Sequence, residues 1–254
     1  MASFSQSPLS NSSSPNPKKS KGMKIHLIGD SLSVMSVHGK PVTTPGSALA
    51  FLLAGQGHTV SVDAVGGFAI QYFRPGAART KLGMRAAKMI DTAKAAQPDL
   101  LLIALGTNDY ADSPKALESG IRAIVNAFST PGIQPALKWL GPPSFSEQAK
   151  GGRVKEGTAR VYEALEKSLR PVIDTRPLSS DLTVPPLRAG DLIHFSGKGA
   201  KLYAARMAKA IQGEMVPRRP VALRVGLGEA LLVVGLLDIL LRGPITKFFS
   251  GKKT

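Results

Sequence analysis

A serine, a histidine and an aspartate occupy short motifs whose order and spacing suit proton transfer to and from a reacting group. Gly29-Asp30-Ser31 directly follows the apolar run 25–28, and Asp191 lies three residues before His194 far downstream. A serine hydroxyl becomes an effective nucleophile beside a base, and a histidine oriented by a carboxylate supplies that base. The spacing therefore predicts Ser31 as nucleophile, His194 as general base and Asp191 as the carboxylate that orients the imidazole.

A third motif, Gly106-Thr107-Asn108-Asp109, lies between these two and also follows an apolar run. In content and order the motifs resemble the SGNH or GDSL-type hydrolases, which are serine esterases and acyl hydrolases. The resemblance extends over about residues 24–211 and implies the same three catalytic roles. It also implies an oxyanion hole made of the Ser31 backbone N–H, Gly67 and Asn108.

The chemistry of these residue types agrees with such roles. Ester hydrolysis passes through a tetrahedral oxyanion, and one well-aimed donor contributes about 3 kcal/mol to its stabilisation. A glycine such as Gly67 offers an N–H with no side chain in the way, and Asn108 offers a side-chain NH₂. In an Asp-x-x-His unit the carboxylate can reach Nδ1–H, which leaves Nε2 to take the serine proton.

Each motif also has an ordinary structural interpretation. Gly, Asp and Ser are all favoured in turns, and Asp191 and His194 could form a surface pair. The conjunction favours the catalytic interpretation, because each motif follows a predicted strand or lies in a loop where an open α/β sheet binds its ligand.

The remaining histidines and the composition point to little other chemistry. His26 lies inside the first predicted strand, His58 opens another, and His38 lies in a loop near Ser31 where it could contact substrate. The chain has no cysteine and no clustered His or carboxylate residues at metal-ligand spacing. We therefore predict neither a metal site nor a cofactor.

Strands and helices alternate along the sequence. Apolar or alternating runs predict strands at 24–28, 58–64, 99–105, 136–140 and 172–174. The segments between and after these strands predict helices at 46–56, 81–96, 114–128, 157–169 and 197–215. This alternation predicts an α/β fold, a three-layer α/β/α sandwich around a parallel sheet. The family resemblance implies a flavodoxin-like strand order.

The two ends of the chain differ in composition from the middle. Residues 1–22 are rich in Ser, Pro, Asn and Lys, which predicts a disordered basic tail, and they contain no apolar stretch typical of a secretion signal. The hydrolase-like domain is predicted at 23–216, and Pro217 and Pro220 introduce an apolar and basic segment at 217–254. Without a signal, the predicted location is cytoplasmic, membrane-peripheral or within an assembled particle.

The apolar run 221–241 predicts a C-terminal helix. Arg224, Glu229 and Asp238 interrupt it, and a charge at a bilayer centre costs about 3 kcal/mol, so the pattern favours an amphipathic helix over a spanning one. We expect this segment to dock on a protein partner, on a second copy of the chain or on a membrane surface.

The net charge of +16 at pH 7 predicts anionic neighbours, whether nucleic acid, a phospholipid surface or a polyanionic polymer. Aromatic residues make up only 6% and are not interleaved with basic ones. The composition therefore does not predict a dedicated nucleic-acid module.

Together these features predict a serine-dependent ester hydrolase. The expected substrate is an O-acyl group on a carbohydrate or a small lipid-like ester, cleaved through an acyl-serine intermediate. Two other hypotheses stay open at this point. The domain could be a structural or attachment module of a larger assembly such as a virus particle, or a peripheral membrane lipase held by its last segment.

Overall fold

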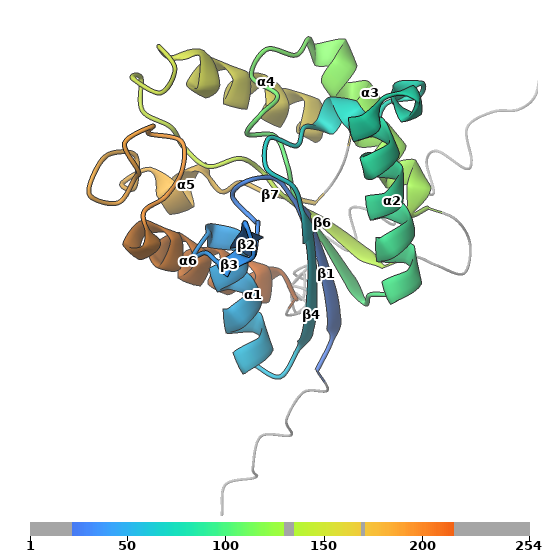
Figure 1. The fold of residues 1–254 in the computed structure, drawn as a ribbon, viewed down its shortest axis with the longest axis horizontal. Helices are drawn as coiled ribbons and strands as arrows, with labels where there is room; N and C mark the ends of the chain where they lie inside the picture. The colour runs from blue at the N-terminus through green and yellow to red at the C-terminus, as the bar shows by residue number, and fades with distance from the viewer. Residues whose placement is uncertain (1–21, 130–134, 169–170, 216–254) are drawn as a thin grey trace, which may run out of the picture. The chain divides into compact units, whose positions relative to one another are not determined.

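A five-stranded parallel sheet forms the centre of the fold. The computed structural model describes residues 22–129, 135–168 and 171–215. Its sheet has the order β4-β1-β5-β6-β7 (Figure 1). The strands are β1 (Lys24–Gly29), β4 (Thr59–Ala64), β5 (Leu100–Ala104), β6 (Ala136–Leu140) and β7 (Val172–Ile173). This is the order of flavodoxin-like sheets, so the predicted fold class is confirmed.

Helices cover both faces of the sheet. On one face lie α1 (Pro45–Gly55) and α6 (Gly197–Met215), and on the other lie α2 (Lys81–Ala96) and α3 (Pro114–Ala127) (Figure 1). The helix α4 (Arg153–Ser168) packs against α3 and shares one hydrophobic cluster with α2 and α3. The short elements are β2 (Ser36–Val37), β3 (Lys40–Pro41), η1 (Ile70–Phe73), η2 (Ala77–Arg79) and α5 (Arg176–Ser179).

The central strands are buried because both faces of the sheet are covered. Ile28, Ile103 and Trp139 belong to the cluster shared with α2, α3 and α4, whereas Leu27 and Leu140 line a cavity on the side of α1 and α6. Successive side chains of a strand point to opposite faces, so a strand covered on both sides reads as a continuous apolar run. The one polar atom of the Trp139 side chain is satisfied, since Nε1 donates to the Leu105 carbonyl at 3.1 Å.

Local signals explain where most helices begin. The hydroxyl of Thr80 accepts from the Gly83 N–H at the start of α2, and Ser113 caps α3 in the same way through Ala116. The prediction for α4 was wrong at its start. The helix begins at Arg153 and not at 157, because the left-handed residues end at Gly152, with φ of 83°, and the chain is helical from the next residue.

The sheet register brings the sequence motifs to one edge. Gly29 of β1 is aligned with Ala64 of β4 and with Ala104 of β5. The chain therefore leaves three adjacent parallel strands at the same level, and the segments that follow them carry Ser31, Gly67 and Asn108. The carboxyl edge of an open α/β sheet is where such folds bind ligands.

The tail predicted at 1–22 and the segment predicted at 217–254 lie, apart from residue 22, outside the described residues, as does the predicted C-terminal helix. Their roles and the location of the protein therefore stay predictions. Among the helices that are described, none combines the length and the apolar character needed to cross a bilayer.

We expect Gly120→Ala to destabilise the fold. A Cβ at Gly120 in α3 would lie 2.5 Å from the Ile70 carbonyl oxygen, so the helix or η1 would have to move. The free energy of unfolding should fall by about 1–3 kcal/mol. Chemical denaturation would measure this, with Gly55→Ala in α1 as the matched control.

Nothing lies within 4 Å of a Cβ built at Gly55, so that control should be as stable as the wild type or slightly more stable. A Gly120→Ala protein as stable as this control would show that the close packing of α3 on η1 is wrong.

Candidate active site

Ser31 lies in a tight turn at the end of β1. The Asp30 carboxylate faces inward, and its Oδ1 accepts from the Leu32 N–H at 2.9 Å, while the Asp30 carbonyl accepts from the Ser33 N–H at 2.9 Å. The Gly46 N–H at the start of α1 binds the Leu32 carbonyl at 2.9 Å. These bonds tie the turn to α1 and leave the Ser31 side chain half-buried at the surface.

The structure brings the three predicted catalytic side chains together. His194 Nε2 lies 3.0 Å from Ser31 Oγ, and His194 Nδ1 lies 2.5 Å from Asp191 Oδ2. A carboxylate accepts only, so Nδ1 carries the hydrogen and Nε2 is free to accept the serine proton. This is the geometry of a nucleophile, a base and an orienting group.

Asp191 is held as a carboxylate by more than the imidazole. Its Oδ1 accepts from the backbone N–H groups of His194 and Ile193 at 2.9 and 3.0 Å. Partial burial acts to raise the pKa of Asp191, but the hydrogen bonds from the His194 ring and from these two backbone groups outweigh it and hold that pKa below its usual value. Asp191 therefore stays ionised at neutral pH.

The loop that carries His194 is fixed by a buried arginine that sequence reasoning missed. Arg188 is 2% exposed and donates to the carbonyls of Leu182, Ser144 and Ile193 at 2.7, 2.7 and 2.5 Å. Its guanidinium lies 3.5 Å from the centroid of the Phe195 ring. Five donors in a planar fork suit this set of carbonyls, which a lysine could not satisfy together. Nothing in the local sequence distinguishes Arg188 from a surface arginine.

The two predicted oxyanion donors lie on linked segments. Gly67 has φ of 71° in a turn closed by the Phe68 N–H and the Val65 carbonyl at 3.2 Å, and a positive φ at this position favours glycine. Asn108 Nδ2 donates to the Phe68 carbonyl at 2.9 Å. An amide has two hydrogens, so the second N–H of Asn108 is available for an oxyanion.

Two buried carboxyl groups support these segments, and sequence reasoning assigned them no role. Burial raises the pKa of Asp30 to about 6, against hydrogen bonds from the Leu32 N–H and Thr107 that lower it. Burial also raises the pKa of Asp109 to about 8. Both residues lie within the sequence motifs, but their spacing alone gives no sign that they point into the protein.

Two of the other three histidines, His26 and His58, have structural partners. His26 Nδ1 lies 2.7 Å from Ser61 Oγ inside the sheet, and His58 Nδ1 accepts from the Met23 N–H at 3.1 Å. His38 is exposed between β2 and β3. In the part of the chain that the structure describes, no three His, Asp or Glu side chains come together as metal ligands would.

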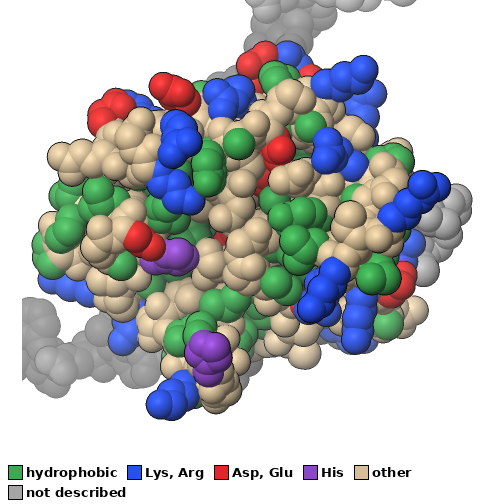
Figure 2. Space-filling view, turned by 45° about the horizontal axis from the view of Figure 1, so that its top comes forward, with side chains coloured by type: hydrophobic (Ala, Val, Ile, Leu, Met, Phe, Trp, Pro, Cys, Tyr) green, Lys and Arg blue, Asp and Glu red, His purple; other side chains and the backbone are tan. Residues whose placement is uncertain are grey.

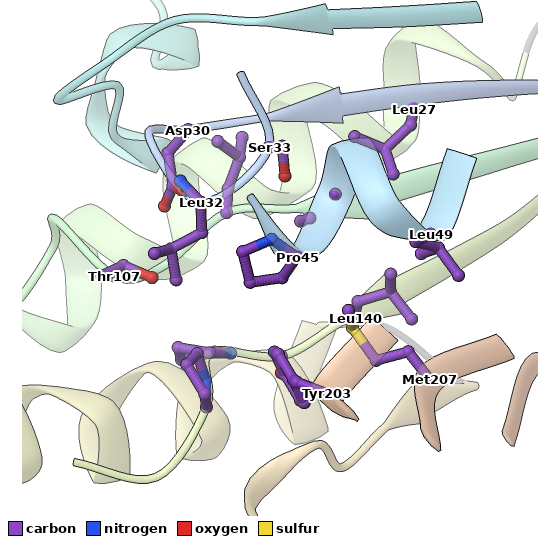
Figure 3. Close-up of a pocket in the computed structure, with 16 residues that line it drawn as sticks. Leu27, Asp30, Leu32, Ser33, Pro45, Leu49, Thr107, Leu140, Tyr203 and Met207 are labelled. Atoms are coloured by element: carbon purple, nitrogen blue, oxygen red, sulfur yellow. The ribbon is translucent and has the colours of Figure 1, made fainter. Parts of the chain in front are cut away.

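The His194 and Asp191 side chains are open to solvent, whereas the protein beneath the Ser31 turn is closely packed around a small cavity. Figure 3 shows Asp30 and Ser33 across a small cavity from Tyr203 and Met207 of α6. This cavity has a volume of about 30 Å³, which is room for a water molecule or two. On the face drawn in Figure 2, Lys and Arg side chains are scattered among uncharged ones and do not form a single stripe.

Comparison with solved structures shows that this fold is shared with ester-cleaving enzymes. The structure is similar to a lipase/acylhydrolase from Enterococcus faecalis, with a TM-score of 0.54 and 20% identity over 75% of this chain and 96% of that one. It is also similar to an acetylxylan esterase from Geobacillus stearothermophilus, with a TM-score of 0.55 and 19% identity over 75% of this chain and 94% of that one.

No curated protein matches the chain. A family model described as the GDSL-like Lipase/Acylhydrolase family matches residues 27–202, which include every predicted site residue. Because this match spans more than half of the sequence, the chain belongs to the GDSL-like lipase/acylhydrolase family and is an ester hydrolase.

Proposed function

We propose that this ester hydrolase removes a short O-acyl group, such as acetyl, from a carbohydrate, and that it does so through an acyl-Ser31 intermediate. The observation that carries the mechanism is the hydrogen-bonded series from Asp191 through His194 to Ser31 Oγ, with distances of 2.5 and 3.0 Å. Such a series activates a serine hydroxyl at neutral pH.

The geometry supports the following steps. Ser31 Oγ attacks the ester carbonyl carbon as His194 Nε2 takes the hydroxyl proton, and the carbonyl oxygen becomes an oxyanion. The oxyanion accepts hydrogen bonds from Asn108 Nδ2 and from the backbone N–H groups of Ser31 and Gly67. The intermediate then collapses, the bond to the leaving oxygen breaks, and His194 gives its proton to that oxygen.

A water molecule completes the cycle. It attacks the acyl carbon while His194 Nε2 takes one of its protons, and the second oxyanion occupies the same donors. Collapse of this intermediate releases the carboxylic acid and returns the proton to Ser31 Oγ. Asp191 does not change its charge in either half, since its role is to orient the imidazole and stabilise the imidazolium.

The exposure of the site supports a large alcohol as the leaving group. The Asp191 and His194 side chains are 47% and 46% exposed, so a bulky leaving group can approach them from solvent. The cavity beneath the Ser31 turn is lined by neither Ser31 nor His194, so it is not a pocket for the acyl group. The similar fold of an enzyme named as an acetylxylan esterase agrees with this substrate class.

A small lipid-like ester is the second candidate. Met35 and Val37 follow Ser31 closely in sequence and are 49% and 46% exposed, so they could contact an apolar substrate. The attachment-module hypothesis is not favoured. The chain belongs to a family of acyl hydrolases, and Ser31, His194 and Asp191 are hydrogen-bonded as hydrolysis requires, whereas a purely structural module would not need this arrangement.

We expect the enzyme to prefer short acyl chains. The kcat/KM for p-nitrophenyl acetate should exceed that for the octanoate by about 10-fold or more, and acetate should be released from acetylated xylan. Blank-corrected initial rates measure both. A preference for the octanoate would support the lipid-like substrate, and no release of acetate from any acetylated carbohydrate would contradict the carbohydrate assignment.

We expect Ser31→Ala to lower kcat by roughly 10⁴–10⁶-fold, since the nucleophile is lost. His194→Ala should cost nearly as much, and the double variant should be no worse than either single one, because the residues act as a unit. Hydrolysis of p-nitrophenyl acetate measures this, with Ser36→Ala, an exposed serine in β2, as the matched control. A double variant that shows the product of both losses would contradict the shared mechanism.

We expect Asn108→Ala to lower kcat by about 10²–10³-fold with little change in KM, because its donor acts on the transition state. The control is Asn126→Ala, an exposed residue of α3. Thermal unfolding of both variants checks that the segment held by Asn108 keeps its place. An Asn108→Ala enzyme with an unchanged kcat would remove this residue from the oxyanion hole.

A further inference from the structure

Two carboxyl groups meet directly behind the candidate oxyanion hole. Asp109, the neighbour of Asn108, is 1% exposed, and its Oδ1 accepts from the Ile70 N–H at 2.8 Å. Its side chain also contacts that of Asp112, which precedes α3 and whose backbone N–H donates to the Asp109 carbonyl at 3.0 Å. The Oδ2 atoms of Asp109 and Asp112 are both buried, and neither has a hydrogen-bond donor among the described residues.

Two acceptor oxygens cannot satisfy each other unless one of them carries a proton. Two ionised carboxylates in contact repel, and burial makes the charged form of Asp109 more costly. One proton between them removes one charge and supplies the missing donor. Burial, the contact with Asp112 and its charge all raise the pKa of Asp109, to about 8, against the backbone N–H groups of Ile70 and Gln71 that lower it.

No cation replaces that proton in the described part of the chain. Just after η1, Arg74 directs its Nε–H to the Gln71 carbonyl at 3.1 Å, and from α4, Arg160 donates to the Tyr110 carbonyl at 2.5 Å. Asp112 is thus the charged group that faces Asp109.

The pair lies where it can hold the oxyanion hole. Asp109 Oδ1 binds the Ile70 N–H, and the adjacent Asn108 binds the Phe68 carbonyl, so consecutive residues after β5 hold the segment that follows Gly67. α3 closes the other side, where Gly120 leaves no space for a Cβ beside Ile70. A shift of Ile70 would therefore be passed on to the Gly67 N–H.

We propose that Asp109 and Asp112 share one proton at neutral pH and that this acid–carboxylate pair is the positioning device of the oxyanion hole. Asp109 is a positioning residue, since it acts through Ile70 and does not touch substrate. The role in catalysis depends on the proposed function. The shared proton does not.

The kinetic test compares Asp109→Asn with Asp109→Leu. Asparagine keeps an oxygen for the Ile70 N–H and gives Asp112 a permanent donor, whereas leucine removes both. Wild-type kcat should fall as pH rises from 7 through about 8, because deprotonation leaves two repelling carboxylates. Asp109→Asn should keep a neutral-pH kcat close to wild type and lose this alkaline decline. Asp109→Leu should lower kcat by roughly 10²-fold with a smaller change in KM.

Asp112→Asn is the matched variant on the other member of the pair. Its amide would donate to an ionised Asp109, so the alkaline decline should disappear here too. A decline unchanged in both asparagine variants would overturn the positioning role, and it would leave the ester hydrolase assignment intact.

The shared proton can be tested without any substrate. A raised pKa means that the folded state binds the proton more tightly than the unfolded chain, so this contribution to stability is full below about pH 4. It is lost as pH rises to about 8. The Tm of the wild type should therefore fall more between pH 5 and 8 than that of Asp109→Asn, a comparison in which the contribution of Asp30 cancels.

Infrared difference spectra at pH 7 supply the direct readout. The wild type minus Asp109→Asn should show the C=O stretch of a protonated carboxylic acid. A wild type without this band, or a Tm that depends on pH equally in both proteins, would overturn the shared proton even if the enzyme proved active.

Discussion

The hydrogen bond between His194 Nε2 and Ser31 Oγ joins residues 163 positions apart in the chain, and the rest of the structure serves to make it possible. A bond of 3.0 Å between two loops has little strength of its own in a site this exposed. It is supported because each loop is held by hydrogen bonds of its own. The sheet supplies the frame, since it ends beneath the Ser31 turn and the linked oxyanion segments.

The two loops are held by buried polar groups of opposite charge. On the serine side, Asp30 turns inward and accepts the Leu32 N–H, so the turn is fixed from below. On the histidine side, Arg188 donates to three backbone carbonyls, two of them within six residues of it and the third, that of Ser144, 44 residues away. Burying such groups is costly unless their hydrogen bonds are satisfied. Asp30 and Arg188 are buried in this way beside the carboxyl edge of the sheet, where the candidate site lies.

Much of this arrangement could be predicted from the sequence, because the strongest patterns are local. The run at 100–104 is apolar on both faces of a covered strand, and Ser31, His194 and Asp191 stand in motifs whose spacing reflects their chemistry. The structure brings these three side chains together, while their catalytic roles stay a proposal. The strands β2 and β3 are two residues each, too short to give a periodic signal. Arg188 and Asp109 act through contacts made in three dimensions, which no local pattern records.

The account makes one central claim, that Ser31 is a nucleophile activated by His194. Covalent labelling tests it most directly. The protein would be treated with a fluorophosphonate and the modified residue identified by peptide mass spectrometry, in the wild type and in His194→Ala. We expect one label, on Ser31, in the wild type and a strongly reduced labelling rate in the variant, because without the base the hydroxyl keeps its proton. Labelling of another serine, or equal rates in both proteins, would contradict the claim.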